Sequence, residues 1–180
     1  MTTYHLNLPL TQLNIHDFHI GDIIYLSGII GTGRDHVHKR ICEFIENDES
    51  LPPLFSNFHQ GAIYHMGPIV KKQSDGKYQI ISGGPTTSSR MEPYQERVCK
   101  NLEIRFVIGK GGMKNIDWNK INAIYLSFPG GVGAIVSKFI SKIISVEWLD
   151  FGTPEAVWIL KMNHFGPLIV SIDTENQSLY

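Results

Sequence analysis

An isoleucine-rich run opens the stretch that decides the fold, Asp22-Ile-Ile-Tyr-Leu-Ser-Gly-Ile-Ile-Gly-Thr-Gly-Arg34. The continuous apolar residues over Asp22–Ile30 are typical of a strand buried on both faces. The glycines that follow end the strand, and Asp35 is predicted to cap a helix. The apolar stripe of that helix contains Val37, Ile41, Phe44 and Ile45. This local plan predicts an α/β fold.

The same plan recurs twice along the chain. Ile81-Ser-Gly-Gly-Pro-Thr-Thr-Ser-Ser-Arg90 again joins a strand to a helix through a loop with threonines and an arginine. Leu126-Ser-Phe-Pro-Gly-Gly131 keeps the glycines but has neither threonine nor arginine. A helix N-terminus presents free backbone N–H groups. Loops that join the end of a strand to a helix N-terminus therefore favour the binding of anions. Ligands of open α/β sheets lie at the carboxyl ends of the strands.

Hydrophobic pattern and Gly/Pro positions predict the remaining elements. They are an edge strand over Tyr4–Leu10, strands over Gly61–Lys72 (interrupted at Gly67-Pro68) and Lys77–Ser82 with a hairpin turn at Gln73–Gly76, a helix over Pro93–Leu102, strands over Ile104–Ile108 and Ala123–Phe128, a helix from the Pro129–Gly133 loop to about Ile143, and two strands over Glu155–Met162 and Pro167–Asp173. No linker or low-complexity tract interrupts this order, so we expect one α/β domain over residues 1–180.

The composition excludes several classes of protein. The 180 residues are 42% hydrophobic and 18% charged, enough to form a core, and the net charge of −1 argues against a dedicated nucleic-acid binder. Two cysteines, Cys42 and Cys99, are too few for a disulfide scaffold or a thiolate metal site. We find neither a secretory signal nor an apolar run long enough to span a membrane, and therefore expect a cytoplasmic protein.

Three loops supply the cations Arg34, Arg90 and Lys110. Arginine can hold a carboxylate with two parallel hydrogen bonds, whereas lysine acts as a point charge. Hydroxyl groups accompany them at Thr32, Thr86, Thr87, Ser88 and Ser89. The combination predicts a pocket for a small anion with one or more carboxylates. The alternative is that these residues are solvated surface cations and helix-capping hydroxyls.

The loop sequences resemble those of one family. Gly31-Thr-Gly-Arg-Asp-His-Val-His-Lys39, Gly84-Pro-Thr-Thr-Ser-Ser-Arg-Met91 and Ile108-Gly-Lys-Gly-Gly-Met113 are similar to signature loops of the β subunit, or C-terminal domain, of class I iron–sulfur fumarate hydratase and L(+)-tartrate dehydratase. The segments Pro129–Ala134 and Glu147–Trp158 are similar as well. The resemblance implies a single swivelling β/β/α domain with a mixed sheet and helices that follow Gly-rich loops.

The resemblance also implies site residues. It places substrate binding on Arg34, Thr86, Thr87, Arg90 and Lys110, with Thr86 as the catalytic base. The implied reaction is the reversible hydration of fumarate to (S)-malate by a lyase that needs a 4Fe–4S cluster. Since a cluster needs three or four thiolates, it would belong to a partner α subunit in an α2β2 assembly, and this chain would bind no metal.

Several alternatives stay open. A threonine hydroxyl needs a partner base, from Asp35 or the partner chain, or strong cationic stabilisation; otherwise Thr86 only positions the substrate. The function could instead be that of an L(+)-tartrate dehydratase β subunit, or of a non-catalytic dicarboxylate-binding module. Nucleotide binding is disfavoured, because Gly131-Val-Gly-Ala-Ile-Val136 has no third glycine. Asp150 and Glu155 are expected to be ordinary turn and surface carboxylates.

Overall fold

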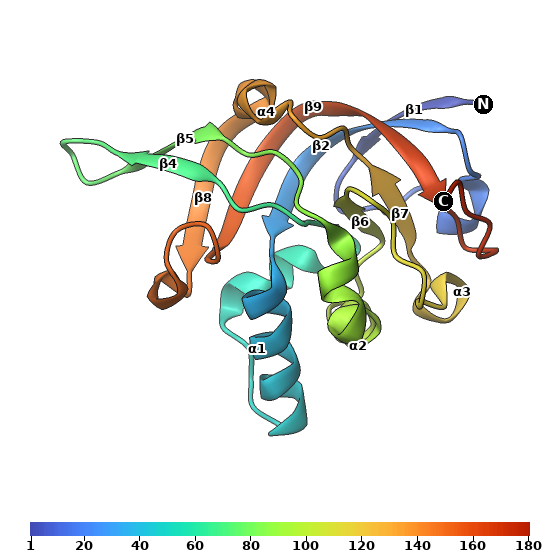
Figure 1. Cartoon of the computed structure of the whole chain (residues 1–180), viewed down its shortest axis with the longest axis horizontal. Coiled ribbons are helices and arrows are strands. Elements are labelled where there is room, and N and C mark those ends of the chain that lie inside the picture. The colour runs from blue at the N-terminus through green and yellow to red at the C-terminus, as the bar shows by residue number, and fades with distance from the viewer.

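A computed structural model describes all residues, 1–180, and shows a curved mixed sheet with helices on both sides (Figure 1). The strands are β1 (Thr3–Asn7), β2 (Ile23–Thr32), β3 (Ala62–Tyr64), β4 (Ile69–Lys72), β5 (Tyr78–Ser82), β6 (Phe106–Gly109), β7 (Ile124–Ser127), β8 (Ile140–Glu147) and β9 (Val157–Ile172). The α-helices are α1 (Asp35–Glu46), α2 (Glu92–Leu102), α3 (Trp118–Ile121) and α4 (Gly133–Phe139). This arrangement confirms a mixed α/β fold. None of the helices is long and apolar enough to cross a bilayer.

Pairing closes five strands into a ring. The main sheet has the order β1-β2-β3-β6-β7-β9-β8, and β2 also pairs with β9. The strands β1, β2, β3, β6 and β7 are mutually parallel, and β9 runs antiparallel to β2, β7 and β8. The strands β4 and β5 form a separate two-stranded hairpin that projects from the body (Figure 1). The parallel strands of the ring therefore run in one direction, and α1 and α2 pack on the outer face of the ring.

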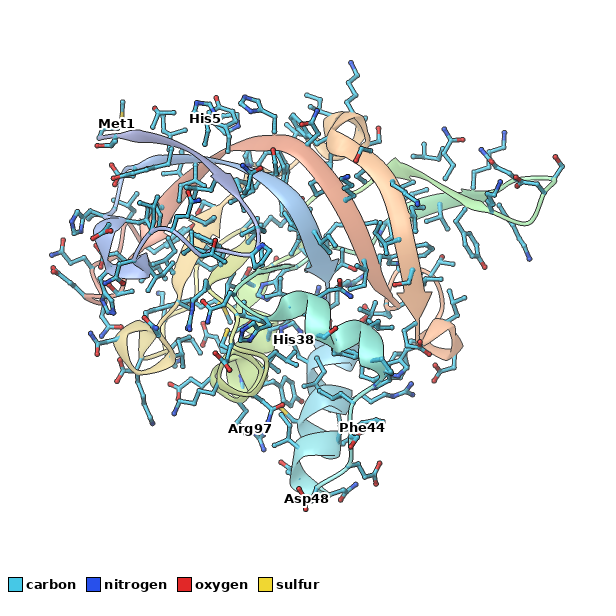
Figure 2. All side chains as sticks on the ribbon, turned by 180° about the vertical axis from the view of Figure 1, so that it is seen from behind. Met1, His5, His38, Phe44, Asp48 and Arg97 are labelled. Carbon is cyan, nitrogen blue, oxygen red and sulfur yellow. The ribbon has the colours of Figure 1, made fainter.

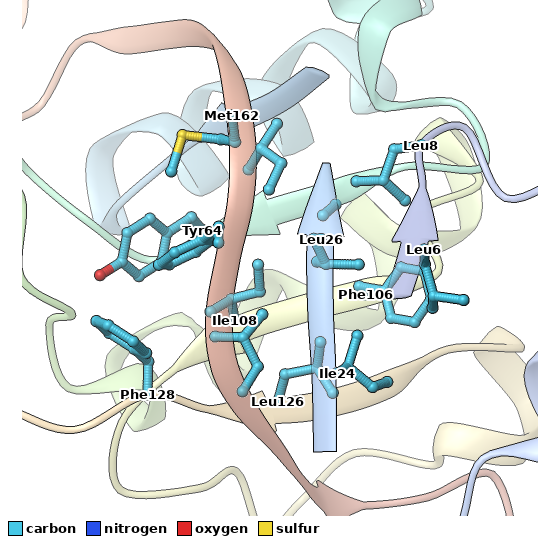
Figure 3. Packing of buried hydrophobic residues seen from close by; sticks show 14 of the residues in the cluster. Leu6, Leu8, Ile24, Leu26, Tyr64, Phe106, Ile108, Leu126, Phe128 and Met162 are labelled. Carbon is cyan, nitrogen blue, oxygen red and sulfur yellow. The ribbon is translucent and has the colours of Figure 1, made fainter. Parts of the chain in front are cut away.

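Two apolar cores share the parallel strands. Because side chains alternate along a strand, Phe106 and Ile108 of β6 pack inside the ring, while Val107 faces the helices. In β7, Leu126 likewise points inward and Tyr125 outward. Figure 3 shows the inner cluster. Burying each large side chain stabilises the fold by about 1.5–3 kcal/mol. Both faces are thus buried in β6 and in most of β7. The strand for which this was expected, β2, instead alternates between buried and half-buried residues over its first half and is fully buried only over Ile30–Thr32.

The structure corrects three local predictions. Arg34 occupies the N-cap position of α1 and Asp35 is the first helical residue, so Asp35 does not cap the helix. The helix expected to reach Ile143 ends at Phe139, because the following isoleucine-rich segment pairs with β9 as strand β8.

The two strands expected at the end of the chain are one strand, β9, which continues through Gly166-Pro167. The ladder of β2 with β9 extends on both sides of this dipeptide, from Gly31 paired with Ile159 to Ile23 paired with Ile169. Shifts of register in that ladder absorb the irregular segment, so a Gly-Pro pair that locally indicates a turn does not end the strand.

Candidate functional site

Three loops meet where the parallel strands end. The loop after β2 leads into α1 through Arg34, and the loop after β6 carries Lys110. The threonine loop (Gly83–Arg90) follows β5, which lies in the hairpin and not in the main sheet. It nevertheless reaches the same edge, since the Thr86 N–H donates to the His65 carbonyl at 2.8 Å and Thr87 forms a parallel bridge with Lys110.

Arg34 is fixed by an acidic residue far away in the sequence. Its Nε lies 2.8 Å from Oε1 of Glu155, and the two side chains are only 23% and 14% exposed. A Cβ on Gly67 would lie 2.8 Å from Nη1 of Arg34 and 2.3 Å from the Pro154 carbonyl oxygen, so only glycine leaves room there. This ion pair therefore forms at Nε of the guanidinium, and Nη1 packs against Gly67.

Arg90 and Thr86 form the second part of the site. Nη2 of Arg90 donates to Oγ1 of Thr86 at 2.5 Å and lies 3.9 Å from Oδ1 of Asp35. Asp35 makes no hydrogen bond to Thr86; it neighbours Thr86 through Arg90. Arg90 therefore contacts both Thr86 and Asp35, the first residue of α1, and Arg34 precedes Asp35 at the N-cap of this helix.

Lys110 lies beside Thr87 along the backbone, but its side chain extends toward another loop. Its Nζ is 3.8 Å from where a Cβ on Gly130 would lie. A cavity of about 380 Å³ lies next to it, lined in part by Ser127, Gly130 and Tyr180. A larger cavity, about 610 Å³, lies at the other end of α1 and contains none of the predicted site residues.

Two of the hydroxyls expected in a binding pocket are structural instead. Thr32 is fully buried, and its Oγ1 accepts the Trp158 N–H at 3.0 Å. Ser88 is also fully buried, with Oγ 2.8 Å from His65 Nδ1 and 2.8 Å from the Tyr125 hydroxyl. These two positions therefore offer no hydroxyl to a ligand.

Buried groups below the loops were not predicted from the sequence. His65 Nε2 lies 2.9 Å from Oε1 of Gln95, whose Nε2 donates to Cys99 Sγ at 3.2 Å. His38 lies where α1 meets the sheet (Figure 2), and its Nδ1 is 2.9 Å from the Arg34 carbonyl oxygen. Burial lowers the pKa of His38 to about 4 and holds the pKa of His65 well below its usual range.

The cysteines do not fit a metal centre. Both are buried free thiols, and burial raises the pKa of Cys99 to about 12 and that of Cys42 above its usual value. A thiol held protonated by burial is a poor ligand. No group of three or more His, Cys, Asp or Glu side chains in this chain could hold a metal ion.

The carboxylates that the sequence leaves as surface groups differ in role. Asp150 is indeed exposed, and it binds Arg40 at 2.6 Å. Glu155 is instead mostly buried against Arg34, with Oε2 3.5 Å from Nδ1 of His36. No local signal identifies Glu155, because its partner lies more than a hundred positions earlier in the chain.

Comparison with known proteins gives a consistent assignment. The family described as fumarase C-terminus matches residues 1–180. A putative L(+)-tartrate dehydratase subunit beta of Methanocaldococcus jannaschii is 40% identical over 175 residues, covering 95% of this chain and 88% of the relative. The L(+)-tartrate dehydratase subunit beta of Escherichia coli K12 is 36% identical over 177 residues, covering 97% and 85%.

A third relative differs in length. A putative fumarate hydratase class I of Geobacillus stearothermophilus is 36% identical over 178 residues, which cover 97% of this chain but only 33% of the relative. The region that matches this chain is therefore one part of a longer polypeptide in that protein. On the full-length family match and these identities, the chain belongs to the fumarase C-terminus family, as a β subunit of the class I fumarase and tartrate dehydratase type.

Proposed function

We propose that this chain, as one domain over residues 1–180, is the β subunit of a hydro-lyase that removes water from a hydroxy-dicarboxylate, with fumarate hydration to (S)-malate as the first reaction to test. The observation that carries the proposal is that Arg90 contacts both Thr86 and Asp35, the residue that follows Arg34, at the N-terminus of α1. In this proposal a 4Fe–4S cluster belongs to a partner α subunit, since the cysteines here do not fit one. An α2β2 assembly is part of the same proposal.

Arg34 binds and orients one substrate carboxylate. The ion pair with Glu155 restricts the Arg34 side chain, and the Nη groups of its guanidinium can donate two parallel hydrogen bonds to a carboxylate. Holding the substrate in one orientation lowers the barrier, because the entropy of alignment is lost on binding and not in the reaction.

Arg90 or Lys110 stabilises the charge that develops during the reaction; Arg90 is the one in contact with Thr86, whereas the Lys110 side chain lies beside Gly130. Removing the proton next to the second carboxylate of malate spreads negative charge onto that group and produces an aci-carboxylate. Cations fixed near it stabilise the transition state more than the ground state. Arg90 is 45% exposed, so it is accessible to a ligand at this surface.

Thr86 removes the proton in this scheme. The Arg90 guanidinium donates to Thr86 Oγ1, and a cation at this distance favours the deprotonated hydroxyl. Asp35 is placed to orient Arg90 and does not itself contact Thr86. The electron pair of the broken C–H bond forms the carbon–carbon double bond as hydroxide leaves with the C–O pair. The proton taken up by Thr86 is then released and balances this hydroxide as water, which returns Thr86 to its deprotonated form.

A second reaction of the same chemical class is L(+)-tartrate dehydration. It is favoured by the 36–40% identity to tartrate dehydratase β subunits over 85–88% of their length. Tartrate carries a second hydroxyl, so both diacids must be assayed. A non-catalytic dicarboxylate-binding module is the alternative from another class, and it requires malate binding to the isolated chain.

Arg90→Ala in the complex with the α subunit tests the proposal. Loss of a charge-stabilising contact lowers kcat by about 10²–10³-fold. The matched control is Arg97→Ala, because Arg97 lies on α2 with 47% exposure and pairs with Glu46 outside the site. We expect normal turnover from Arg97→Ala, and near-normal turnover from Arg90→Ala would remove Arg90 from the site.

A further inference from the structure

A continuous chain of buried polar groups lies beneath the threonine loop. It links Tyr125 of β7, Ser88, His65 and Gln95 of α2, all without solvent exposure. The distances are 2.8 Å from the Tyr125 hydroxyl to Ser88 Oγ, 2.8 Å from Ser88 Oγ to His65 Nδ1, and 2.9 Å from His65 Nε2 to Gln95 Oε1. We refer to these four residues as the buried chain.

The proton positions in the buried chain follow from its far end. The Gln95 amide nitrogen donates to Cys99 Sγ, so the Gln95 oxygen accepts from Nε2–H of His65. Burial keeps the imidazole neutral, which leaves Nδ1 as an acceptor for the Ser88 hydroxyl. Ser88 Oγ then accepts the Tyr125 hydroxyl proton. All three hydrogen bonds are thus donated in the same direction, from Tyr125 to Ser88, from Ser88 to His65 and from His65 to Gln95.

The buried chain is attached to both loops that carry proposed site residues. The His65 carbonyl accepts the Thr86 N–H at 2.8 Å, and the Lys110 carbonyl accepts the Ser88 N–H at 3.0 Å. Gly109 packs against the same serine, since a Cβ there would lie 1.9 Å from Ser88 Oγ. Displacing Ser88 would therefore move Thr86 relative to Lys110.

A requirement for stability alone does not account for the buried chain. Burying four polar side chains gains little net free energy over apolar residues of the same shape, and leaving one of them unpaired is costly. A fully paired polar chain does, however, hold the groups attached to it in one fixed arrangement. The attached groups here are the backbones of Thr86 and Lys110.

We propose that Ser88 and His65 are positioning residues that hold the catalytic threonine loop in register with the Lys110 loop. The inference rests on the proposed function, because it assigns a role to residues that act through Thr86. A displacement of about 1 Å at a reacting group lowers the rate by about 10²-fold. Arg34 is held separately by Glu155, so substrate binding through Arg34 stays intact.

The test compares two buried serines in the complex with the α subunit. Ser88→Ala is expected to lower kcat by about 10–100-fold with KM changed less than about threefold. The control is Ser171→Ala, because Ser171 is 3% exposed and donates to the Ile169 carbonyl within β9, with no hydrogen bond to the threonine loop or to the Lys110 loop. Ser171→Ala is expected to lower the melting temperature by a similar amount and to leave kcat unchanged. Equal kcat in the two variants would overturn the inference.

Two further measurements keep the test decisive. Tyr125→Phe removes the outermost donor and keeps the Ser88–His65 hydrogen bond, so kcat is expected to stay within about threefold of wild type. A loss of kcat as large as that of Ser88→Ala would contradict the proposed order of the hydrogen bonds.

The ¹⁵N chemical shifts of His65 in the isolated chain should show a neutral ring protonated at Nε2, and a ring protonated at Nδ1 would also overturn the inference. That NMR result stands even if the wild-type complex hydrates no diacid, which would refute the proposed function instead.

Discussion

Replacing Arg34 by alanine separates what this residue does for folding from what it does for the proposed reaction. The variant leaves the Glu155 carboxylate, only 14% exposed, without its partner 2.8 Å away. It also removes the two Nη groups that are proposed to bind a substrate carboxylate. A second variant, Arg34→Ala with Glu155→Gln, removes the uncompensated charge while keeping Arg34 absent.

The magnitude follows from the partial burial of the pair. Losing one partner costs about 0–1 kcal/mol for an exposed ion pair and about 3–5 kcal/mol for a fully buried one. Side chains that are 23% and 14% exposed lie between these limits, so we expect about 2 kcal/mol. At about 2–4 °C per kcal/mol for a chain of this size, the melting temperature should fall by about 4–8 °C. The double variant should recover roughly half of that loss.

Activity should respond differently. We expect Arg34→Ala to lower kcat/KM of the complex by about 10²–10³-fold, and the double variant to stay as inactive although its stability recovers. Calorimetry of the isolated chain and steady-state kinetics of the complex give the two readouts. If turnover returned together with the melting temperature in the double variant, Arg34 would be a folding residue and not a substrate ligand.

Two further predictions concern the buried ionisable groups. Because the pKa of His38 falls from 6.5 in the unfolded chain to about 4 in the folded one, the unfolded state binds more protons in this window, and His38 alone should lower the free energy of unfolding by about 3 kcal/mol between about pH 7 and pH 4. Buried His65 adds to the same decline, because its pKa is also held well below its usual range. Urea unfolding at several pH values measures this, with His38→Gln as the variant that makes the decline smaller; a flat wild-type curve contradicts it. Cys42 and Cys99 should not react with a disulfide reagent at about pH 8 until the chain unfolds, because both thiols are buried and burial raises their pKa. Rapid modification of the folded chain would contradict this prediction.

The sequence predicts those parts of the fold that depend on neighbouring residues. The β2–loop–α1 unit, the β4–β5 hairpin and α2 follow from local hydrophobic period and turn residues, and all three are confirmed. The closure of the ring is different, because β2 pairs with β9 across more than a hundred residues. The segment after Phe139 forms a strand and not the expected helix for the same reason, because its strand conformation depends on pairing with β9.

The candidate site divides in the same way. Arg34, Thr86 and Arg90 could be proposed from loops that combine glycine, threonine and arginine, and the structure places Thr86 and Arg90 in contact beside Asp35. Glu155 and His65 could not, since each matters through a partner distant in sequence: Arg34 for Glu155, and Ser88 and Gln95 for His65. Burial, which turns Thr32 and Ser88 from candidate ligands into structural groups, is likewise a property of the assembled fold.

The central claim is that this chain supplies carboxylate-binding cations to a site completed by another subunit. The most direct test measures the hydration of fumarate and the dehydration of L(+)-tartrate by the purified chain, by an iron–sulfur α subunit, and by the two mixed without oxygen. We predict turnover of at least one diacid by the mixture and none by either part alone. Turnover by this chain without a partner, or none by a mixture shown to form a complex with an intact cluster, would contradict the account.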